Sequence, residues 1–511
     1  MVLNELTLTK AREGLREKKF KARDLTEACL EQIERSEPHL KSFITVVADF
    51  ARKRADWADK ILQNQPQEAK KYPLLGIPYS LKDLFCTAGI LTTAGSRMLE
   101  NFVPPYNATV YQRLEAAGAV LLGKTNLDAF AHGSSTEASD FFVTRNPWKI
   151  EHLPGGSSGG SAASVVAHQA IFSLGTETGG SIRQPAAWCG AVGLKPTYGR
   201  VSRYGVIAMA SSLDCPGPIT KSVADAAFVL QVIAGHDPRD ATSSPLPRPF
   251  YPRALKNSLA GIKIGYARQY LEEPVLPAVA AAVEETFTVF EKLGAEIKEI
   301  ELLDPAYAIA VYTILQRAEV FSNLARYDGL RYGYSLLRRG EKIEAADIYE
   351  LIAANRGQGF GAEAKKRIML GAYTLAESLS ADLEEPFYWL GQKMRTRIVA
   401  DFARAFGEVD LIIGPTSPTT ALKLGAREKN PLFGEMEDRL VEPSTIAGLP
   451  GISLRCGFVD QLPVGLQIIG PQFKEDLVLR AAYAYEQATD WHLYQPPLFS
   501  STRRSRRHYR V

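Results

Sequence analysis

The sequence predicts an α/β fold with a mixed, mostly parallel central sheet that is covered by helices on both faces. From residue 73 onward, short apolar runs such as LLGIPYSL, AVLLG, AIFSLG, IKIGYA, DLIIGP and VGLQIIG alternate with longer helical patterns such as VADAAFVLQVIAG and PAVAAAVEETFTVFEKLG. Strands that alternate with helices favour a parallel or mixed sheet buried between helical layers. The 511 residues are 46% hydrophobic, which is enough apolar material for a large core.

Three regions are expected along the chain. Residues 1–65 show apolar positions at helical spacing between charged neighbours, which predicts an N-terminal helical region packed on the core. Residues 66–490 are expected to form one domain, in which a helical segment, 308–407, is inserted before the strand signals return. Residues 491–511 end in TRRSRRHYRV and are expected to form a basic C-terminal tail.

Composition excludes several classes of protein. A net charge of +3 on so long a chain is too small to hold nucleic acid by charge alone, so a role with nucleic acid would need a partner. The five cysteines are scattered and form no C-x-x-C pair, which argues against a disulfide framework or a zinc site and for a reducing compartment. No window approaches the ~18 apolar residues of a membrane span, and the N-terminus lacks a signal-peptide pattern. A cytoplasmic protein without a membrane association is expected.

The stretch LPGGSSGGSAAS, Leu153–Ser164, is unusually rich in glycine and serine. A phosphate-binding P-loop needs a lysine directly after its second glycine, and this stretch has none. The G-x-S-x-G pattern of serine hydrolases is also absent. A slack linker is disfavoured because a helix pattern and an apolar strand follow immediately. Catalytic chemistry is the remaining interpretation.

Two further features could supply that chemistry. In GTETGGSIRQPAAWCG, glycines before Ser181 allow consecutive N–H groups to form a concave nest, so Ser181 is either a nucleophile beside an oxyanion site or the cap of a glycine turn. Lys82 interrupts the apolar strand in PLLGIPYSLKDLF, and its neighbour Asp83 should face the opposite side. Lys82 is either a desolvated general base or an edge lysine whose amine reaches water.

Together these segments resemble the amidase signature family. The motifs are GIPYSLKD at Gly76, GGSSGGS at Gly155 and GGSIR at Gly179, in the family's order and with Ser157 and Ser181 24 positions apart. The resemblance implies that 66–490 is an amidase signature domain. It also implies a catalytic triad in which Lys82 is the base, Ser157 is the proton bridge after a cis peptide bond, and Ser181 is the nucleophile. Ser158 is implied to support the triad, and the oxyanion hole is implied to be formed by Thr178, Gly179 and Gly180. No metal is implied.

Within that family the chain is most similar, over about residues 5–490, to the glutaminase subunits of tRNA-dependent amidotransferases. This resemblance implies hydrolysis of glutamine to glutamate and ammonia, with Arg367 holding the α-carboxylate and Asp438 the α-ammonium. It implies that the chain works with two partners, the B and C subunits of a heterotrimer. The B subunit would bind most of the tRNA together with ATP and Mg, and this chain would hold no cofactor. The ammonia would amidate Glu-tRNA(Gln), Asp-tRNA(Asn) or both.

Two alternatives stay open at this point. One is a stand-alone amidase acting on another small amide, which would share every catalytic residue. The other is a catalytically silent scaffold protein. Two positions also depart from the family pattern: Glu177 stands where aspartate is more frequent, and His132 stands where these glutaminases usually carry methionine.

Overall fold

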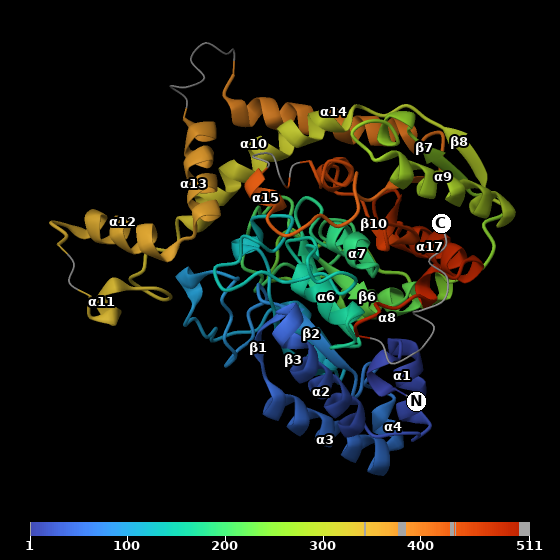
Figure 1. Cartoon of the computed structure of the whole chain (residues 1–511), viewed down its shortest axis with the longest axis horizontal. Helices are drawn as coiled ribbons and strands as arrows, with labels where there is room; N and C mark the ends of the chain where they lie inside the picture. Colours follow the sequence, from blue (N-terminus) through green and yellow to red (C-terminus); the bar gives the residue numbers. More distant parts are fainter. Residues whose placement is uncertain (1, 342–343, 377–384, 430–433, 435, 500–511) are drawn as a thin grey trace.

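The computed structural model describes residues 2–341, 344–376, 385–429, 434 and 436–499. Its centre is an eleven-stranded sheet with the strand order β1-β3-β2-β4-β6-β5-β10-β11-β9-β7-β8 (Figure 1). The strands are β1 Phe43–Val46, β2 Pro78–Lys82, β3 Val120–Thr125, β4 Phe172–Glu177, β5 Val192–Lys195, β6 Cys215–Thr220, β7 Lys263–Tyr266, β8 Glu296–Glu299, β9 Leu411–Pro415, β10 Gly451–Val459 and β11 Leu462–Ile469.

The sheet is mixed, as the sequence predicts. Parallel pairs occur in two groups, β3-β2-β4 and β9-β7-β8, where helices connect the strands. The six other neighbouring pairs are antiparallel, a larger share than expected. One cause is the tight β10–β11 hairpin, whose turn residues Asp460 and Gln461 have φ values of 50° and 64°. Positive φ at both turn residues is typical of a type I′ turn, which permits only antiparallel pairing.

Helices cover both faces of the sheet. Every residue of β2, β3, β4, β5, β6, β9 and β11 is buried. Since successive side chains of a strand point to opposite faces, complete burial requires a covering layer on each side. The predicted fold class is therefore confirmed.

The helices are α1 Leu8–Arg16, α2 Ala22–Leu40, α3 Ala48–Asn64, α4 Pro66–Ala69, α5 Thr109–Ala116, α6 Gly159–Val166, α7 Arg183–Cys189, α8 Val223–Ile233, α9 Pro277–Lys292, α10 Pro305–Leu324, α11 Leu336–Arg339, α12 Ile348–Gly359, α13 Ala362–Leu375, α14 Phe387–Ala405, α15 Ala426–Lys429, α16 Glu442–Ile446 and α17 Glu475–Ala488. The helices α10–α14 correspond to the helical segment expected at 308–407. Among the described residues, no helix combines the length and apolar character that a membrane span needs.

The N-terminal region is mostly helical but also contributes an edge strand. The strand β1 pairs with β3, so residues 1–65 are part of the central sheet as well as of its helical cover. The sequence did not predict this strand, because the strand is only four residues long and its residues become more exposed from Phe43 to Val46. At the other end, most of the expected basic tail, residues 500–511, lies outside the described residues.

Candidate active site

Lys82 is the last residue of β2 and is completely buried. Its Nζ lies 2.7 Å from Ser157 Oγ and 2.9 Å from Ser158 Oγ. It also lies 2.9 Å from Thr176 Oγ1 and 3.3 Å from the Thr176 carbonyl oxygen. The edge-lysine interpretation is therefore wrong: the amine does not reach water but ends in a cluster of hydroxyl groups.

Burial also changes the acidity of this amine. It lowers the pKa of Lys82 to about 7, against an opposing effect of Asp128, Asp214 and Glu177. The adjacent carboxylate, Asp83, does not neutralise it, because Asp83 faces the other side of the strand and pairs with the buried Lys124 at 3.1 Å. A large fraction of Lys82 is thus uncharged near neutral pH and able to accept a proton.

The glycine-serine stretch holds the two serines against Lys82. The Gly156–Ser157 peptide bond is cis, as the family resemblance implies. Ser158 is the N-cap of α6, so the helix begins at Gly159, within the glycine-serine stretch. Ser158 Oγ also lies 3.2 Å from the carbonyl oxygen of Thr176, to which it donates. Both hydroxyl groups are therefore fixed by the start of a helix and by β4.

Ser181 lies in the short loop between β4 and α7. Its carbonyl oxygen accepts a hydrogen bond of 3.3 Å from the Ser158 N–H, which places the loop directly beside the glycine-serine stretch. Ser181 is 4% exposed to solvent, whereas Lys82 and Ser157 are completely buried. That position suits a group that must meet an incoming substrate.

The loop before Ser181 contains the residues that were expected to form the oxyanion hole, Thr178, Gly179 and Gly180. Within the described part of the chain, no hydrogen bond uses the backbone N–H of Gly179, Gly180 or Ser181. The Thr178 side chain anchors the loop, since its hydroxyl donates to Asp214 at 2.7 Å. Unengaged N–H groups at one glycine-rich turn are free to donate to an oxyanion.

A buried ion pair supports this loop, and it was not predicted from the sequence. Glu177 Oε1 accepts from Arg183 Nη2 at 2.6 Å, and both side chains are completely buried. Glu177 Oε2 accepts from the N–H groups of Ile182 and Arg183. Thr445 links the pair to the loop by donating to the Gly179 carbonyl at 2.7 Å. Glu177, which departs from the usual aspartate, therefore positions both ends of the nucleophile loop.

Asp438 lies against the same loop. A side chain at Gly180 would collide with Asp438 Oδ1, so this carboxylate oxygen directly faces the glycine. Asp438 Oδ2 accepts from Ser134 Oγ at 2.6 Å, whereas Oδ1 is buried without a hydrogen-bond partner among the described residues. Burial raises the pKa of Asp438 well above its usual range, and the Ser134 bond opposes that shift. A cationic ligand group at Oδ1 would stabilise the ionised form.

Arg367 approaches from α13 and is 7% exposed. Its Nε donates to Glu363 Oε1 at 2.7 Å, and Arg427 donates to the other oxygen at 2.6 Å. Although burial alone would raise the pKa of Glu363, the charges of these two arginines lower it to about 2. Arg367 also acts electrostatically on Tyr312, whose hydroxyl lies against Gly179. The ion pair with Glu363 orients the Arg367 guanidinium on α13.

His132, the other departure from the family pattern, is buried near Arg367. Burial and the charge of Arg367 lower the pKa of His132 well below its usual value, with Glu363 opposing the shift. The imidazole is therefore neutral. Its two ring nitrogens make no hydrogen bond within the described residues.

The structure brings the expected residues together. Lys82 contacts both Ser157 and Ser158, Ser181 follows on the adjacent loop, and Asp438 lies against that loop at Gly180. Ser134 and Asp214, which bond Asp438 and Thr178, and Tyr312, which lies against Gly179, were not predicted from the sequence. Each comes from a distant segment and lies in no local motif.

Comparisons with known proteins agree with this geometry. Residues 24–479 match the family described as Amidase. The chain is 48% identical over 493 residues to the glutamyl-tRNA(Gln) amidotransferase A subunit of Geotalea daltonii, covering 96% of this chain and 99% of that protein. It is 50% identical over 483 residues to the protein of the same name from Synechococcus elongatus, covering 94% and 97%.

Solved structures show the same relationship. The glutamyl-tRNA(Gln) amidotransferase A subunit of Thermotoga maritima superimposes with a TM-score of 0.76 at 37% identity, covering 95% of each chain. The peptide amidase of Stenotrophomonas maltophilia superimposes with a TM-score of 0.79 at 31% identity, covering 97% of this chain and 99% of that one. On the matched residues, the identity and the fold, the chain belongs to the amidase family.

Proposed function

We propose that this chain is the glutamine-hydrolysing A subunit of a tRNA-dependent amidotransferase. The observation that carries the proposal is the contact of 2.7 Å between Lys82 Nζ and Ser157 Oγ, in a fully buried position beside the Ser181 loop. The near full-length similarity to proteins named as the A subunit of glutamyl-tRNA(Gln) amidotransferase supports the choice of glutamine as substrate.

In this proposal Lys82 acts in its uncharged form. A neutral amine has two N–H donors and one lone pair. Ser158 Oγ, which donates its own proton to the Thr176 carbonyl, accepts one N–H, and Thr176 Oγ1 accepts the other. The lone pair then faces Ser157, whose O–H donates to it. Ser157 is thereby able to take a proton from Ser181 as it passes its own to Lys82.

The reaction is acyl transfer through Ser181. Its oxygen attacks the side-chain amide carbon of glutamine, and the oxyanion is held by the N–H groups of Gly179, Gly180 and Ser181, with Thr178 bracing the loop. The relayed proton leaves with ammonia. Water then attacks the acyl-enzyme, its proton returns along the same serines, and glutamate is released.

The two ends of glutamine are assigned to opposite charges. The Arg367 guanidinium binds the α-carboxylate, for which its planar fork is suited. Asp438 Oδ1, buried and without a protein partner among the described residues, accepts the α-ammonium. This pairing places the side-chain amide toward Ser181, because Asp438 borders the nucleophile loop at Gly180.

The assembly completes the reaction. We assign the amidation of Glu-tRNA(Gln), Asp-tRNA(Asn) or both to a complex with the B and C subunits, in which the B subunit holds most of the tRNA and uses ATP and Mg. The present chain is assigned no cofactor and supplies ammonia.

The proposal is tested by ammonia release from glutamine with and without partners. The chain is purified alone and co-purified with candidate B and C subunits, and ammonia is measured with glutamine as substrate. We expect glutaminase activity that rises when partners are present. Hydrolysis of other small amides in preference to glutamine, unaffected by partners, would instead identify a stand-alone amidase. Failure of Ser181 to react with a fluorophosphonate would indicate a silent scaffold.

Replacement of Arg367 with alanine is expected to raise the KM for glutamine by about 10- to 100-fold, with a smaller effect on kcat. The reason is that a charge-assisted hydrogen bond contributes about 1.5–3 kcal/mol. Steady-state glutaminase kinetics measure both constants. Lys366→Ala, on the exposed side of the same helix, is the matched control and should leave KM unchanged. An unchanged KM in the Arg367 variant would remove this residue from the glutamine site.

A further inference from the structure

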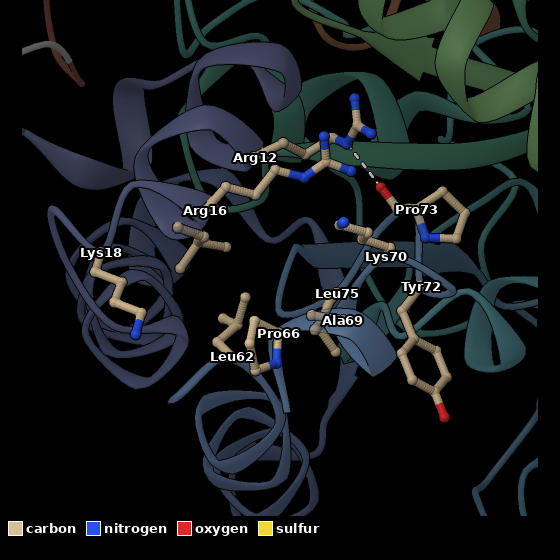
Figure 2. A pocket seen from close by; sticks show the side chains of 11 residues that line it. Arg12, Arg16, Lys18, Leu62, Pro66, Ala69, Lys70, Tyr72, Pro73 and Leu75 are labelled. Carbon is tan, nitrogen blue, oxygen red and sulfur yellow. Dashed lines mark hydrogen bonds between the residues drawn. The ribbon is translucent and has the colours of Figure 1, made fainter. Parts of the chain in front are cut away.

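Two adjoining hollows lie on the surface of the N-terminal region, away from the catalytic serines. The first, of about 440 Å³, is bordered by α1, α4 and the segment that follows α4, and Figure 2 shows its lining. The second, of about 760 Å³, continues toward α8 and residues 248–250. The hollows share Arg12, Arg16, Lys70 and Pro73, so they form one continuous depression, which we call the basic groove.

The lining of the basic groove carries charge of one sign. Its cationic side chains are Arg12, Arg16, Lys18, Lys70, Arg113 and Arg248. No aspartate or glutamate is among the described residues that line either hollow. Such a concentration of positive charge is not expected from the whole chain, in which basic and acidic residues nearly balance to a net charge of +3.

Backbone carbonyls, rather than carboxylates, hold the guanidinium groups of the groove. Arg12 Nε donates to the Pro73 carbonyl at 2.6 Å, the contact drawn in Figure 2. Arg113 donates to the carbonyls of Ile233 at 2.6 Å and Gly235 at 3.1 Å. Arg248 donates to the Ala234 carbonyl. These bonds orient the arginines but leave their charges without a neutralising anion.

The carboxylates that act electrostatically on Arg12 and Arg113, Asp225 and Asp237, accept hydrogen bonds elsewhere. Asp225 accepts the N–H groups of Leu8 and Thr9 at 3.0 Å each, at the start of α1. Asp237 accepts from Arg239 at 3.0 Å and from Ser202 at 2.8 Å. Neither lines the groove.

The cations of the groove act on one another. Burial and the neighbouring charge of Arg16 lower the pKa of Arg12 to about 10, with Asp225 opposing the shift. Arg113 and Arg248 converge over Gly235: a side chain there would lie 3.2 Å from Arg248 Nη1 and 3.7 Å from Arg113 Nη1. Like charges held this close repel one another, and a bound anion would relieve that repulsion.

Aromatic side chains lie between the cations. Arg12 is stacked over the Phe228 ring at 4.3 Å, and Tyr72 borders the first hollow. Phe250, at the far end of the second hollow, is 52% exposed. Grooves that combine a track of cations with exposed aromatic rings are typical of sites that bind a nucleic-acid backbone and stack its bases.

We propose that the basic groove binds the phosphate backbone of RNA, and that this chain contributes its own contact to tRNA. The proposal rests on the proposed function only in naming tRNA as the RNA that the assembled enzyme encounters. Six cations along two joined hollows exceed what one phosphate group requires, which favours an extended polyanion. The exposed aromatic ring favours RNA over an acidic peptide.

The test measures binding of a fluorescein-labelled tRNA transcript to the full chain by fluorescence anisotropy at several salt concentrations. The variant Arg16→Glu/Lys70→Glu changes two exposed cations of the groove. The control Lys292→Glu/Arg397→Glu makes the same change in net charge at exposed positions of α9 and α14, which Figure 1 shows at the opposite end of the molecule from α1 and α4. Thermal unfolding confirms that both variants are folded.

We expect the groove variant to bind tRNA at least about tenfold more weakly than the control, and the slope of log K against log salt to fall in magnitude by about 2. Equal affinity of the two variants would overturn the proposal, as would polyglutamate displacing tRNA from the wild-type chain at equal charge. Glutamine hydrolysis is measured separately and should be unchanged in both variants. A chain that lacks glutaminase activity but shows the binding difference would overturn the proposed function and leave the groove assignment standing.

Discussion

Replacing Ser181 with alanine is expected to reduce glutamine hydrolysis at least about 1,000-fold while leaving the fold intact. The variant lacks the only oxygen that the proposed mechanism uses to form the acyl-enzyme. The fold should persist because the loop is held by backbone groups and by other side chains: the Ser181 carbonyl accepts from Ser158, and Thr445 holds Gly179. Ammonia release measures the loss, and circular dichroism measures the fold.

Ser161→Ala is the matched control for this substitution. Ser161 belongs to the neighbouring glycine-serine stretch and is also buried, but its hydroxyl bonds Thr125 Oγ1 at 2.8 Å and the Leu174 carbonyl at 3.1 Å, away from Lys82. Its loss should lower stability by about 1 kcal/mol and spare most of the activity. Comparable activity of the two variants would exclude Ser181 as the nucleophile.

Lys82 variants should lose activity by a similar factor, again at least about 1,000-fold, because the proton of Ser181 then has no acceptor. Lys82→Ala removes the amine. Lys82→Arg separates charge from basicity, since a guanidinium keeps the positive charge and the N–H donors but does not deprotonate in proteins. If the lysine served only as a fixed charge, the arginine variant would retain substantial kcat.

The pH profile of the wild-type enzyme gives an independent check of the same base. Burial lowers the pKa of Lys82 to about 7, and only the uncharged amine accepts the proton of Ser157. The value of kcat/KM should therefore rise about tenfold per pH unit below about pH 7 and level off above it. A profile that stays flat down to about pH 5.5 would place the base on another residue.

The catalytic centre could be predicted from the sequence because its residues lie in short motifs. Each catalytic residue lies in a short stretch of sequence that can be recognised without knowing the fold: GIPYSLKD, GGSSGGS or GGSIR. The alternation of side chains along a strand also correctly predicted that Lys82 and Asp83 point in opposite directions. The contact between Ser134 and Asp438 joins residues 304 positions apart, so no local pattern could show it.

Strand β6 shows why parts of the sheet were missed. Its sequence, CPGPIT, contains two prolines, and proline lacks the N–H that a central strand needs. The structure accommodates them because β5 pairs with β6 only at Ile219 and Thr220, so positions 216 and 218 have an open side. Strand β8, EIKE, was missed for another reason: it lies at the sheet edge and carries exposed charges.

The basic groove could not be predicted from the sequence, because it depends on residues that only the fold brings together. Its cations come from segments that lie far apart along the chain, between positions 12 and 248. The near-zero net charge argued against a nucleic-acid surface, but net charge averages over the whole molecule and does not show where the charges gather.

The strand order has a consequence for biosynthesis. Strands β10 and β11, residues 451–469, lie between β5 and β9 and so join the two parallel groups of the sheet. A ribosome-bound chain that has not yet released this hairpin already contains Lys82, Ser157 and Ser181, but β5 and β9 each lack one of their two neighbouring strands. The sheet is therefore completed only after residues 451–469 have left the ribosome.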